Sequence, residues 1–247
     1  MTATKIALVG IGKIARDQHI PALNASDAFD LAATVSRSGG VEGIENYETI
    51  EALLEARPDI PAISYCTPPQ VRYAGARAAL EAGRHVMLEK PPGASLSEVH
   101  ALQSLAAEKG LSLFATWHSR MAAGVAPARA WLAGKRITRL RIDWKEDVRK
   151  WHPGQDWVWE PGGFGVCDPG INAYSIFTKI MPFPVFVESA RLTFPANRQT
   201  PVDVEVTFKS GQPHRPAMSS GFNWLEESGE IWTIQGTTGT GDDLKLE

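Results

Sequence analysis

The feature that most constrains the fold is a glycine-rich turn that follows the first apolar stretch. Residues 5–10 read Lys-Ile-Ala-Leu-Val-Gly, which suits a strand buried on both faces of a parallel sheet. Residues 10–15 then read Gly-Ile-Gly-Lys-Ile-Ala, ahead of a helical stretch that we expect to break at Pro21. The first glycine permits a tight turn, the second admits a pyrophosphate, the alanine allows close packing, and the helix N-terminus attracts phosphate. We expect a dinucleotide to contact Gly10, Ile11, Gly12, Lys13 and Ile14.

Strands and helices alternate over the first 117 residues. Helices are expected at 47–57, 71–82 and 95–109, the last with the capping box Ser-Leu-Ser-Glu at its start. Strands are expected at 29–36, 62–66 and 112–117, with another that runs from residue 85 into Glu89. This alternation is typical of a doubly wound parallel sheet. We therefore expect an α/β dinucleotide-binding domain of the Rossmann type over residues 1–120.

In the second half of the sequence, the regular alternation of strands and helices ends. An alanine-rich helix is expected at 122–133, and residues 137–144 alternate apolar and charged side chains, as a half-exposed antiparallel strand does. A tryptophan-dense loop at 150–159 precedes an expected helix at 168–180. Further strands are expected at 185–194, 202–208, 218–224 and 230–235. Residues 121–247 therefore predict an α+β domain with an open, mostly antiparallel sheet.

One lysine is placed just beyond a strand. Residues 87–93 read Met-Leu-Glu-Lys-Pro-Pro-Gly, and the two prolines can continue neither a helix nor a sheet ladder. Ligands bind at the carboxyl ends of parallel strands, so Lys90, beside Glu89, is the first candidate for chemistry. The rigid turn Thr-Pro-Pro follows another strand end, and there we expect cofactor contacts from Cys66, Thr67 and Pro68.

The choice of dinucleotide depends on the end of the second strand. A carboxylate there would bind the ribose of NAD, but this chain has Ser36, Arg37 and Ser38. A guanidinium with a hydroxyl can clamp a 2'-phosphate instead. We therefore favour NADP over NAD, the alternative being that Arg37 belongs to an ordinary surface turn.

Composition excludes several classes of partner. The net charge of −3 gives no basic excess for nucleic acid or an anionic membrane. The chain begins with no signal region, and no apolar run approaches the roughly 18 residues that span a bilayer, so we expect a cytoplasmic protein. Cys66 and Cys167 lie far apart and are expected to be free thiols, and the six histidines lack ligand-like spacing, so no metal site is expected.

Four motifs together resemble the Gfo/Idh/MocA family of sugar-related oxidoreductases. They are the glycine turn, Thr-Pro-Pro at 67–69, Glu-Lys-Pro at 89–91, and the pair Asp168 and Asn172. Within that family, the stretches at 116–120, 144–147 and 151–155 resemble bacterial aldose 1-dehydrogenases of the L-arabinose and D-galactose type. The resemblance covers essentially the whole chain. It implies oxidation of an aldopyranose at C1 to the lactone, with hydride passing to NADP or NAD.

The chain departs from the family pattern at two places. Many family members carry histidine at the position of Asn172, whereas this chain has asparagine, like the aldose dehydrogenases. An imidazole base is therefore not available there. The sequence also ends at residues 244–247 inside an expected strand, whereas members usually continue through a last strand and helix. We therefore expect a chain that is truncated at its C-terminus relative to the family.

Oxidising a hemiacetal needs a base that takes the anomeric hydroxyl proton as the C1 hydride leaves. Asp168 and Asn172, four residues apart at a helix start, would project from one face. From the sequence alone, a helix cap is the commoner role for such an aspartate. With the resemblance, we assign Asp168 as the base, with Lys90 and Asn172 orienting and polarising the hydroxyl. Lys90 as the base is the alternative, because burial favours a neutral lysine.

Sugars present hydroxyls around an apolar ring face, so their sites combine carboxylates and imidazoles with an aromatic platform. We expect Glu146, His118 and His152 to supply the polar groups and Trp151 and Trp232 to supply the platform. The resemblance also implies that Trp117 and His118 contact the cofactor.

Two other functions compete with this one. Another reaction of the family, such as inositol dehydrogenation or reduction of a sugar carbonyl, is disfavoured by the stretches at 144–147 and 151–155. A catalytically silent NADP-binding regulator is disfavoured by intact Lys90, Asp168 and Asn172. We also expect a homodimer through the C-terminal sheet, because a long exposed apolar sheet face is an association site.

Overall fold

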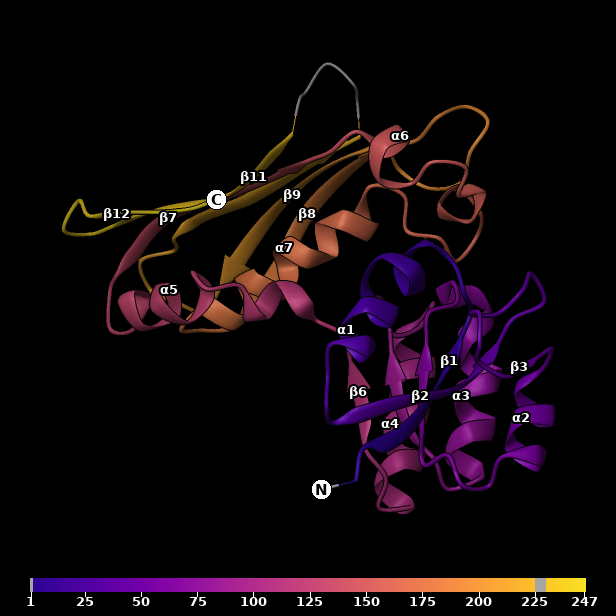
Figure 1. Ribbon diagram of the computed structural model, residues 1–247. Helices are drawn as coiled ribbons and strands as arrows, with labels where there is room; N and C mark the ends of the chain where they lie inside the picture. Colours follow the sequence, from indigo (N-terminus) through magenta and orange to yellow (C-terminus); the bar gives the residue numbers. More distant parts are fainter. Residues whose placement is uncertain (1, 225–229) are drawn as a thin grey trace. The chain divides into compact units, whose positions relative to one another are not determined.

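The chain forms two compact units, Met1–Thr116 and Trp117–Glu247 (Figure 1). The computed structural model describes residues 2–224 and 230–247. Within the first unit, Thr116 still donates its N–H to Leu88 O at 2.9 Å, which ties it to the sheet. The division therefore falls directly after this last strand.

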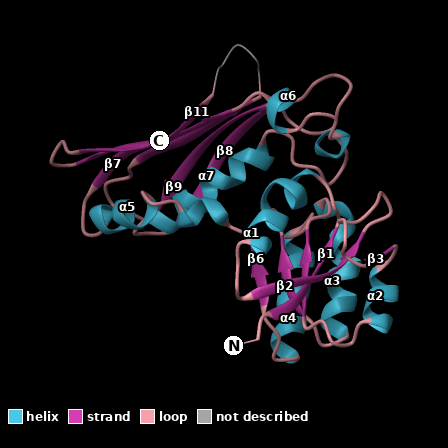
Figure 2. Ribbon diagram, viewed as in Figure 1, coloured by secondary structure: helices cyan, strands magenta, loops and turns pink. Residues whose placement is uncertain are grey.

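The first unit is built on a parallel sheet. Over the described residues it has six strands in the order β3-β2-β1-β4-β5-β6 (Figure 2). From β1 the chain runs outward to β3 and then crosses back to β4, as in the doubly wound dinucleotide-binding fold. The predicted fold class is thus confirmed for this half. The strands are β1 (Thr4–Val9), β2 (Phe29–Val35), β3 (Asn46–Tyr47), β4 (Ala62–Tyr65), β5 (His85–Leu88) and β6 (Leu113–Ala115).

The sequence predicted that the helix after the glycine turn would break at Pro21, and this prediction is wrong. Residues Ala15–His19 form a π-type turn that continues into α1 (Ile20–Asn24). Pro21 lies in the first turn of α1, where a missing N–H is tolerated. The proline therefore marks a change of helix type and not an end.

The remaining helices of this unit lie close to their predicted ranges. They are α2 (Ile50–Ala56), α3 (Arg72–Glu81) and α4 (Leu96–Glu108). The helix predicted from residue 47 starts later, because Thr49 caps α2 through Ala52 N at 3.2 Å while Tyr47 pairs with β2. At α4, Ser95 Oγ accepts from Glu98 N at 3.3 Å, whereas the Glu98 carboxylate accepts from Ala94 N at 2.9 Å.

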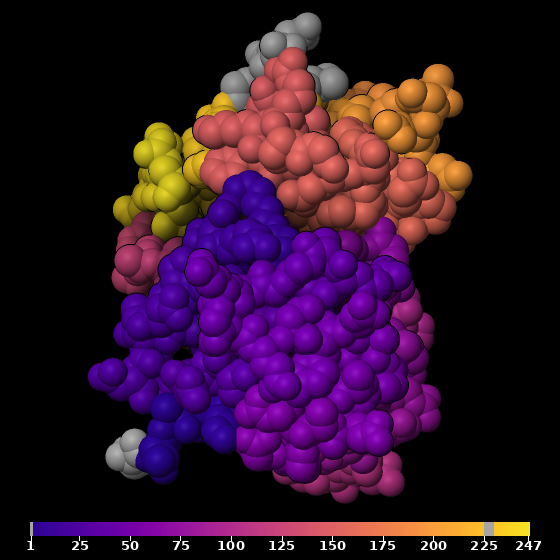
Figure 3. All heavy atoms as spheres, turned by 45° about the vertical axis from the view of Figure 1, so that its right-hand side comes forward, coloured from indigo at the N-terminus to yellow at the C-terminus, as the bar shows by residue number. Residues whose placement is uncertain are grey.

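Small side chains let the helices of this unit approach the sheet closely. Ala76 and Ala79 of α3 are completely buried and belong to one core cluster with Leu88 of β5 and Leu102 of α4. Figure 3 shows one outer face of this unit, coloured indigo to purple.

The second unit is built on a mixed sheet. Its six described strands run in the order β12-β11-β7-β10-β9-β8, and every neighbouring pair is antiparallel except β7 with β10. The prediction of a mostly antiparallel sheet is confirmed. The strands are β7 (Ile137–Lys145), β8 (Val185–Thr193), β9 (Asp203–Ser210), β10 (Ala217–Asn223), β11 (Ile231–Thr238) and β12 (Asp243–Leu246).

Two helices, α5 (Val125–Leu132) and α7 (Cys167–Ile180), lie on one face of this sheet (Figure 1). Gly170 permits the close approach of α7, because a Cβ there would lie 2.4 Å from Phe222 Cδ2. The tryptophan-dense segment is not a plain loop. It contains α6 (Val148–Trp151) and a 3-10 turn over Asp156–Trp159.

The other face of this sheet is polar along its middle strands, in contrast to the apolar face that we expected. Arg141 Nη1 donates to Glu205 Oε2 at 2.8 Å, and its Nη2 donates to Asp143 Oδ1 at 2.8 Å. Gly221 makes room for this guanidinium, since a Cβ would lie 2.2 Å from Arg141 Nη2. Exposed apolar side chains concentrate on the edge strand β8, at Phe186, Val187 and Leu192.

Neither unit has, among its described residues, a helix both long and apolar enough to cross a bilayer. Cys66 is buried, Cys167 is half-buried, and both are free thiols, as predicted.

Candidate functional site

The glycine turn brings together the ends of three strands. Gly10 has a φ of +87°, and a Cβ there would lie 2.7 Å from Thr67 Cγ2, so only glycine fits. Its N–H donates to Val35 O at 2.9 Å. Around Gly12, in contrast, a Cβ would meet no heavy atom within 4 Å. The turn is therefore packed on one side and open on the other, as a cradle for a pyrophosphate requires.

The side chains of this turn have different surroundings. Ile11 and Ala15 are buried in a cluster with Leu8, so Ile11 can offer a ligand only its backbone. Ile14 is exposed, and Lys13 forms an ion pair with Asp17. The close helix–strand packing predicted from Ala15 is present.

A second group lies where β2 ends. Ser36 Oγ is 3.2 Å from Ser38 Oγ and accepts from Ser38 N at 3.3 Å, while Ser36 O accepts from Asn46 Nδ2 at 3.0 Å. These bonds fix a compact turn from which Arg37 is exposed. A guanidinium and a hydroxyl thus stand on one turn beyond the strand.

Lys90 follows β5 by two residues and is half-buried. Its N–H donates to Glu89 Oε2 at 3.0 Å and to Thr116 Oγ1 at 3.2 Å. Glu89 N in turn donates to Tyr65 O at 3.0 Å. The peptide bond to Pro91 is cis. The backbone of Lys90 is therefore fixed at the same sheet edge as the Thr67 turn, with Cys66, Thr67 and Pro68 directly after β4.

Two further residues of the first unit, which the sequence did not single out, lie beside these turns. His19 Nε2 lies 2.7 Å from Glu89 Oε1, and the two side chains are only 9% and 10% exposed. The guanidinium of Arg72 donates to the carbonyl oxygens of Thr67, Glu89 and Pro91. Their positions beside the glycine turn and the Thr-Pro-Pro turn were the only available signals.

In the second unit, Asp168 lies in the first turn of α7 and is 2% exposed. The N-cap is Val166, so Asp168 is not the cap. Its Oδ2 lies 3.4 Å from His152 Nε2. Asn172 is half-buried one turn further along α7, where its carbonyl accepts from Ser175 Oγ at 2.7 Å. The helix thus carries a buried carboxylate with an imidazole beside it and an amide one turn away.

The imidazole of His152 is held from its other side as well. Its Nδ1 lies 3.3 Å from Gln155 Oε1, which also accepts from Trp157 Nε1 at 3.1 Å. The ring centroid of His152 is 5.5 Å from that of Trp224. Both ring nitrogens therefore face oxygen atoms, and the ring orientation is fixed.

Aromatic rings surround the other polar candidate of this unit. Glu146 is buried, and its Oε1 accepts from Trp144 Nε1 at 2.8 Å. Trp232 lies 6.1 Å from Trp144 and 5.7 Å from Trp151 between ring centroids. Trp151 and Trp232 are 38% and 37% exposed, which leaves aromatic surface for a ligand.

Trp117 and His118 begin the second unit. Trp117 is half-buried, whereas His118 is exposed in a 3-10 turn, with Nδ1 3.4 Å from Ser119 Oγ. Lys90 thus belongs to one unit, and Asp168, Asn172 and His152 to the other. Across the described part of the chain, no group of three or more His, Cys, Asp or Glu residues is arranged to hold a metal ion.

Comparisons with known proteins agree with this geometry. Residues 4–116 match the family model GFO_IDH_MocA, described as an oxidoreductase family with an NAD-binding Rossmann fold. The chain is 44% identical to galactose 1-dehydrogenase of Pseudomonas fluorescens over 236 residues, which are 95% of this chain and 75% of that protein.

Solved structures give the same result. D-galactose-1-dehydrogenase from Rhizobium etli superposes with a TM-score of 0.93 at 50% identity, covering 100% of this chain and 79% of that one. The WlbA dehydrogenase from Bordetella pertussis, solved with NADH and UDP-GlcNAcA, has a TM-score of 0.84 at 18% identity, with 99% and 79% covered. At that identity the second likeness concerns the fold alone.

Proposed function

Because the chain belongs to the Gfo/Idh/MocA family of oxidoreductases with an NAD-binding Rossmann fold, we propose that it oxidises an aldopyranose at C1 to the aldonolactone. The observation that carries this proposal is the 44% identity to a galactose 1-dehydrogenase over 95% of the chain. We propose L-arabinose and D-galactose as the sugars to test first, because they share the arrangement of ring hydroxyls at C2 to C4.

The residues of the first unit fit a dinucleotide. The open side of Gly12 and the close packing of Gly10 on Thr67 leave backbone N–H groups for a pyrophosphate. When bound, NAD or NADP supplies the hydride acceptor. We propose NADP as the preferred form, because exposed Arg37 beside the Ser36 hydroxyl suits a 2'-phosphate. The proposed contacts in the first unit are Gly10, Ile11, Gly12, Lys13, Ile14, Ser36, Arg37, Cys66, Thr67, Pro68, Glu89 and Lys90. Trp117 and His118, at the start of the second unit, are proposed as further contacts.

We assign the proton transfer to Asp168. As the hydride leaves C1, the anomeric O–H proton passes to its carboxylate, and the C1–O bond becomes the lactone carbonyl. His152, 3.4 Å from Asp168 Oδ2, orients that carboxylate. Lys90 and Asn172 donate to the anomeric oxygen as charge develops on it. Lys90 as the base is the competing assignment.

Recognition of the sugar is proposed to involve Glu146, His118 and His152. Because both ring nitrogens of His152 face protein oxygens, its contribution comes through the Asp168 carboxylate that it orients. Carboxylate and imidazole groups together accept from and donate to sugar hydroxyls. The exposed rings of Trp151 and Trp232 offer the apolar face on which a pyranose packs.

The test is to mix purified protein with NADP or NAD and each of L-arabinose, D-galactose, D-fucose, D-xylose, D-glucose and myo-inositol. Formation of the reduced cofactor is followed by absorbance. Turnover of an aldose, with the lactone as product, is expected. Turnover of myo-inositol alone would replace this proposal by another reaction of the family. Tight cofactor binding without any turnover would replace it by a cofactor-sensing regulator.

We further propose a homodimer formed through the sheet of the second unit. The face opposite α5 and α7 carries paired charges around Arg141, and edge strand β8 exposes Phe186 and Val187. Light scattering after gel filtration tests this, and a monomer at micromolar concentration would contradict it. A cytoplasmic location is proposed because both cysteines are free thiols.

A further inference from the structure

Arg72 is the first residue of α3 and is 2% exposed. Its guanidinium is directed at backbone oxygens of two different turns. Nη1 donates to both Glu89 O and Pro91 O, and Nη2 donates to Thr67 O. Hydrogen bonds from a charged donor are stronger than neutral ones, and the planar guanidinium holds several acceptors in fixed directions.

The accepting carbonyls have a particular place in the chain. Glu89 and Pro91 flank Lys90, so a single nitrogen atom holds the carbonyl oxygens of the 89–90 and 91–92 peptide groups, which lie before and after the Lys90–Pro91 peptide bond. The N–H of Lys90 is held separately, by Glu89 Oε2 at 3.0 Å and Thr116 Oγ1 at 3.2 Å. The peptide group between Glu89 and Lys90 is thereby held at both its carbonyl oxygen and its N–H.

The third carbonyl belongs to Thr67, whose side chain and backbone are the atoms closest to a Cβ built on Gly10, at 2.7 and 2.9 Å. Strands β4 and β5, which precede the two turns, are neighbours in the parallel sheet. Arg72 therefore joins the turn that packs against the glycine turn to the turn that carries Lys90.

We propose that Arg72 is a positioning residue that couples the cofactor side of the site to Lys90. It does not itself contact the reacting atoms. When the Thr67 turn settles against a bound dinucleotide, the guanidinium transmits that position to the carbonyl groups of Glu89 and Pro91, the residues before and after Lys90. Where it concerns turnover, this inference rests on the proposed function.

The matched variants are Arg72→Lys, Arg72→Gln and Arg77→Lys. Arg72→Lys keeps the buried charge but has no fork to reach three carbonyls, and Arg72→Gln keeps a donor without charge. Arg77, on the same helix, forms an exposed pair with Glu81 at 2.8 Å and serves as the control. Folding of each variant is checked by circular dichroism and by its thermal midpoint.

In the turnover assay, Arg72→Lys should lower kcat by about 10- to 100-fold, as misplacement of a reacting group does, and change the cofactor Kd by less than about threefold. Arg77→Lys should change neither quantity. A wild-type kcat with a lowered thermal midpoint in Arg72→Lys would show a merely structural role and overturn the proposal.

Amide hydrogen exchange gives a readout that needs no activity. In the wild type, the Lys90 amide should be protected, and NADP or NAD should slow exchange in peptides covering residues 88–94. In either Arg72 variant, cofactor binding should protect residues 66–70 as in the wild type but should protect residues 88–94 less than in the wild type. Equal protection of both turns in variant and wild type, or an unprotected Lys90 amide in the wild type, would overturn the coupling. Absence of turnover in the wild type would instead count against the proposed function alone.

Discussion

His19 Nε2 lies 2.7 Å from Glu89 Oε1, which joins the helical turn after the glycines to the residue before Lys90. Burial by itself lowers the pKa of His19, but hydrogen bonding and charge at Cys66 and Glu89 outweigh it and raise that pKa from 6.5 to about 10. Burial likewise raises the pKa of Glu89, yet the hydrogen bond and charge of His19 hold it below its ordinary value. At neutral pH the pair is therefore an imidazolium with a carboxylate.

This pair should make stability depend on pH in a defined way. The pKa of His19 is higher in the folded state, so its contribution is complete below about pH 6.5 and is lost as the pH rises toward 10. The pKa of Glu89 is lower in the folded state, so its contribution is present above about pH 4.5 and is lost as the pH falls further. His19→Gln should reduce the free energy of unfolding by about 3 kcal/mol near pH 6.

The measurement is denaturant unfolding of the wild type and His19→Gln between pH 5 and 10. The difference between them should shrink steadily above about pH 6.5. His100→Gln, an exposed position on α4, is the control and should follow the wild type. A difference that stays constant to pH 10 would show that His19 is not charged in the folded protein.

Arg37→Ala should weaken the affinity for NADP by about 10- to 100-fold, because a charge-assisted contact to the 2'-phosphate is lost. The affinity for NAD should change little. Kd values for both dinucleotides can be measured by calorimetry. Arg77→Ala, an exposed arginine of α3, is the control. Equal loss for NADP and NAD would mean that Arg37 does not contact the 2'-phosphate.

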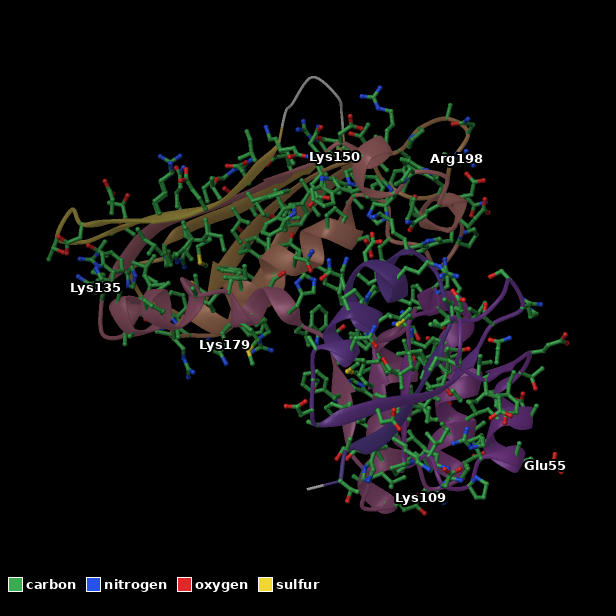
Figure 4. All side chains as sticks on the ribbon, in the orientation of Figure 1. Glu55, Lys109, Lys135, Lys150, Lys179 and Arg198 are labelled. Carbon is green, nitrogen blue, oxygen red and sulfur yellow. The ribbon has the colours of Figure 1, made fainter. Side chains whose placement is uncertain are left out.

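Lys90→Met should abolish turnover, with kcat falling by at least about 1,000-fold, because the anomeric oxygen loses its cationic donor. Cofactor affinity should stay within a few-fold of the wild type. Lys109→Met is the control, since Lys109 ends α4 at the surface (Figure 4). Retention of substantial activity would exclude Lys90 both as base and as donor.

Asp168→Asn should lower kcat by about 100- to 10,000-fold, because the amide has nearly the same shape but cannot take the proton. Asp156→Asn, at an exposed position of the tryptophan-dense segment, should leave kcat unchanged. Steady-state rates over a pH series measure both variants. If Asp168→Asn kept its rate while Lys90→Met lost it, Lys90 would be the base.

The fold of the first unit was predictable because its strands are apolar on both faces and a glycine turn follows the first. Where the predicted elements of this unit were wrong, the causes are local. Pro21 is compatible with a first helical turn, and Tyr47 is drawn into β3 by pairing with Val35, a contact between distant residues. In the second unit, the helix α6 depends on Asp147, whose side chain accepts from Arg149 N at 2.9 Å. The density of tryptophans in this segment, from which a loop was expected, does not indicate such a cap.

For the candidate site, the sequence singled out residues whose types suggest chemistry, such as Lys90 and Asp168, and their roles stay predictions. The partner of His19 lies 70 residues away, so no local pattern indicates it. Arg72 binds backbone carbonyls, which every residue carries and which leave no mark in a sequence. Groups that hold the reacting residues in place therefore emerged only from the folded chain.

The parallel pairing of β7 with β10 has a consequence for how this protein can be changed. Parallel neighbours cannot be joined by a hairpin, so a long connection must leave the end of β7 before the chain returns. The first part of that connection carries Glu146, Trp151, His152, Asp168 and Asn172. Five of the proposed sugar contacts thus lie in one contiguous segment, with His118 and Trp232 outside it. We expect that exchanging residues 146–172 with those of a relative would change the sugar preference, provided that Gly170 is kept beneath Phe222.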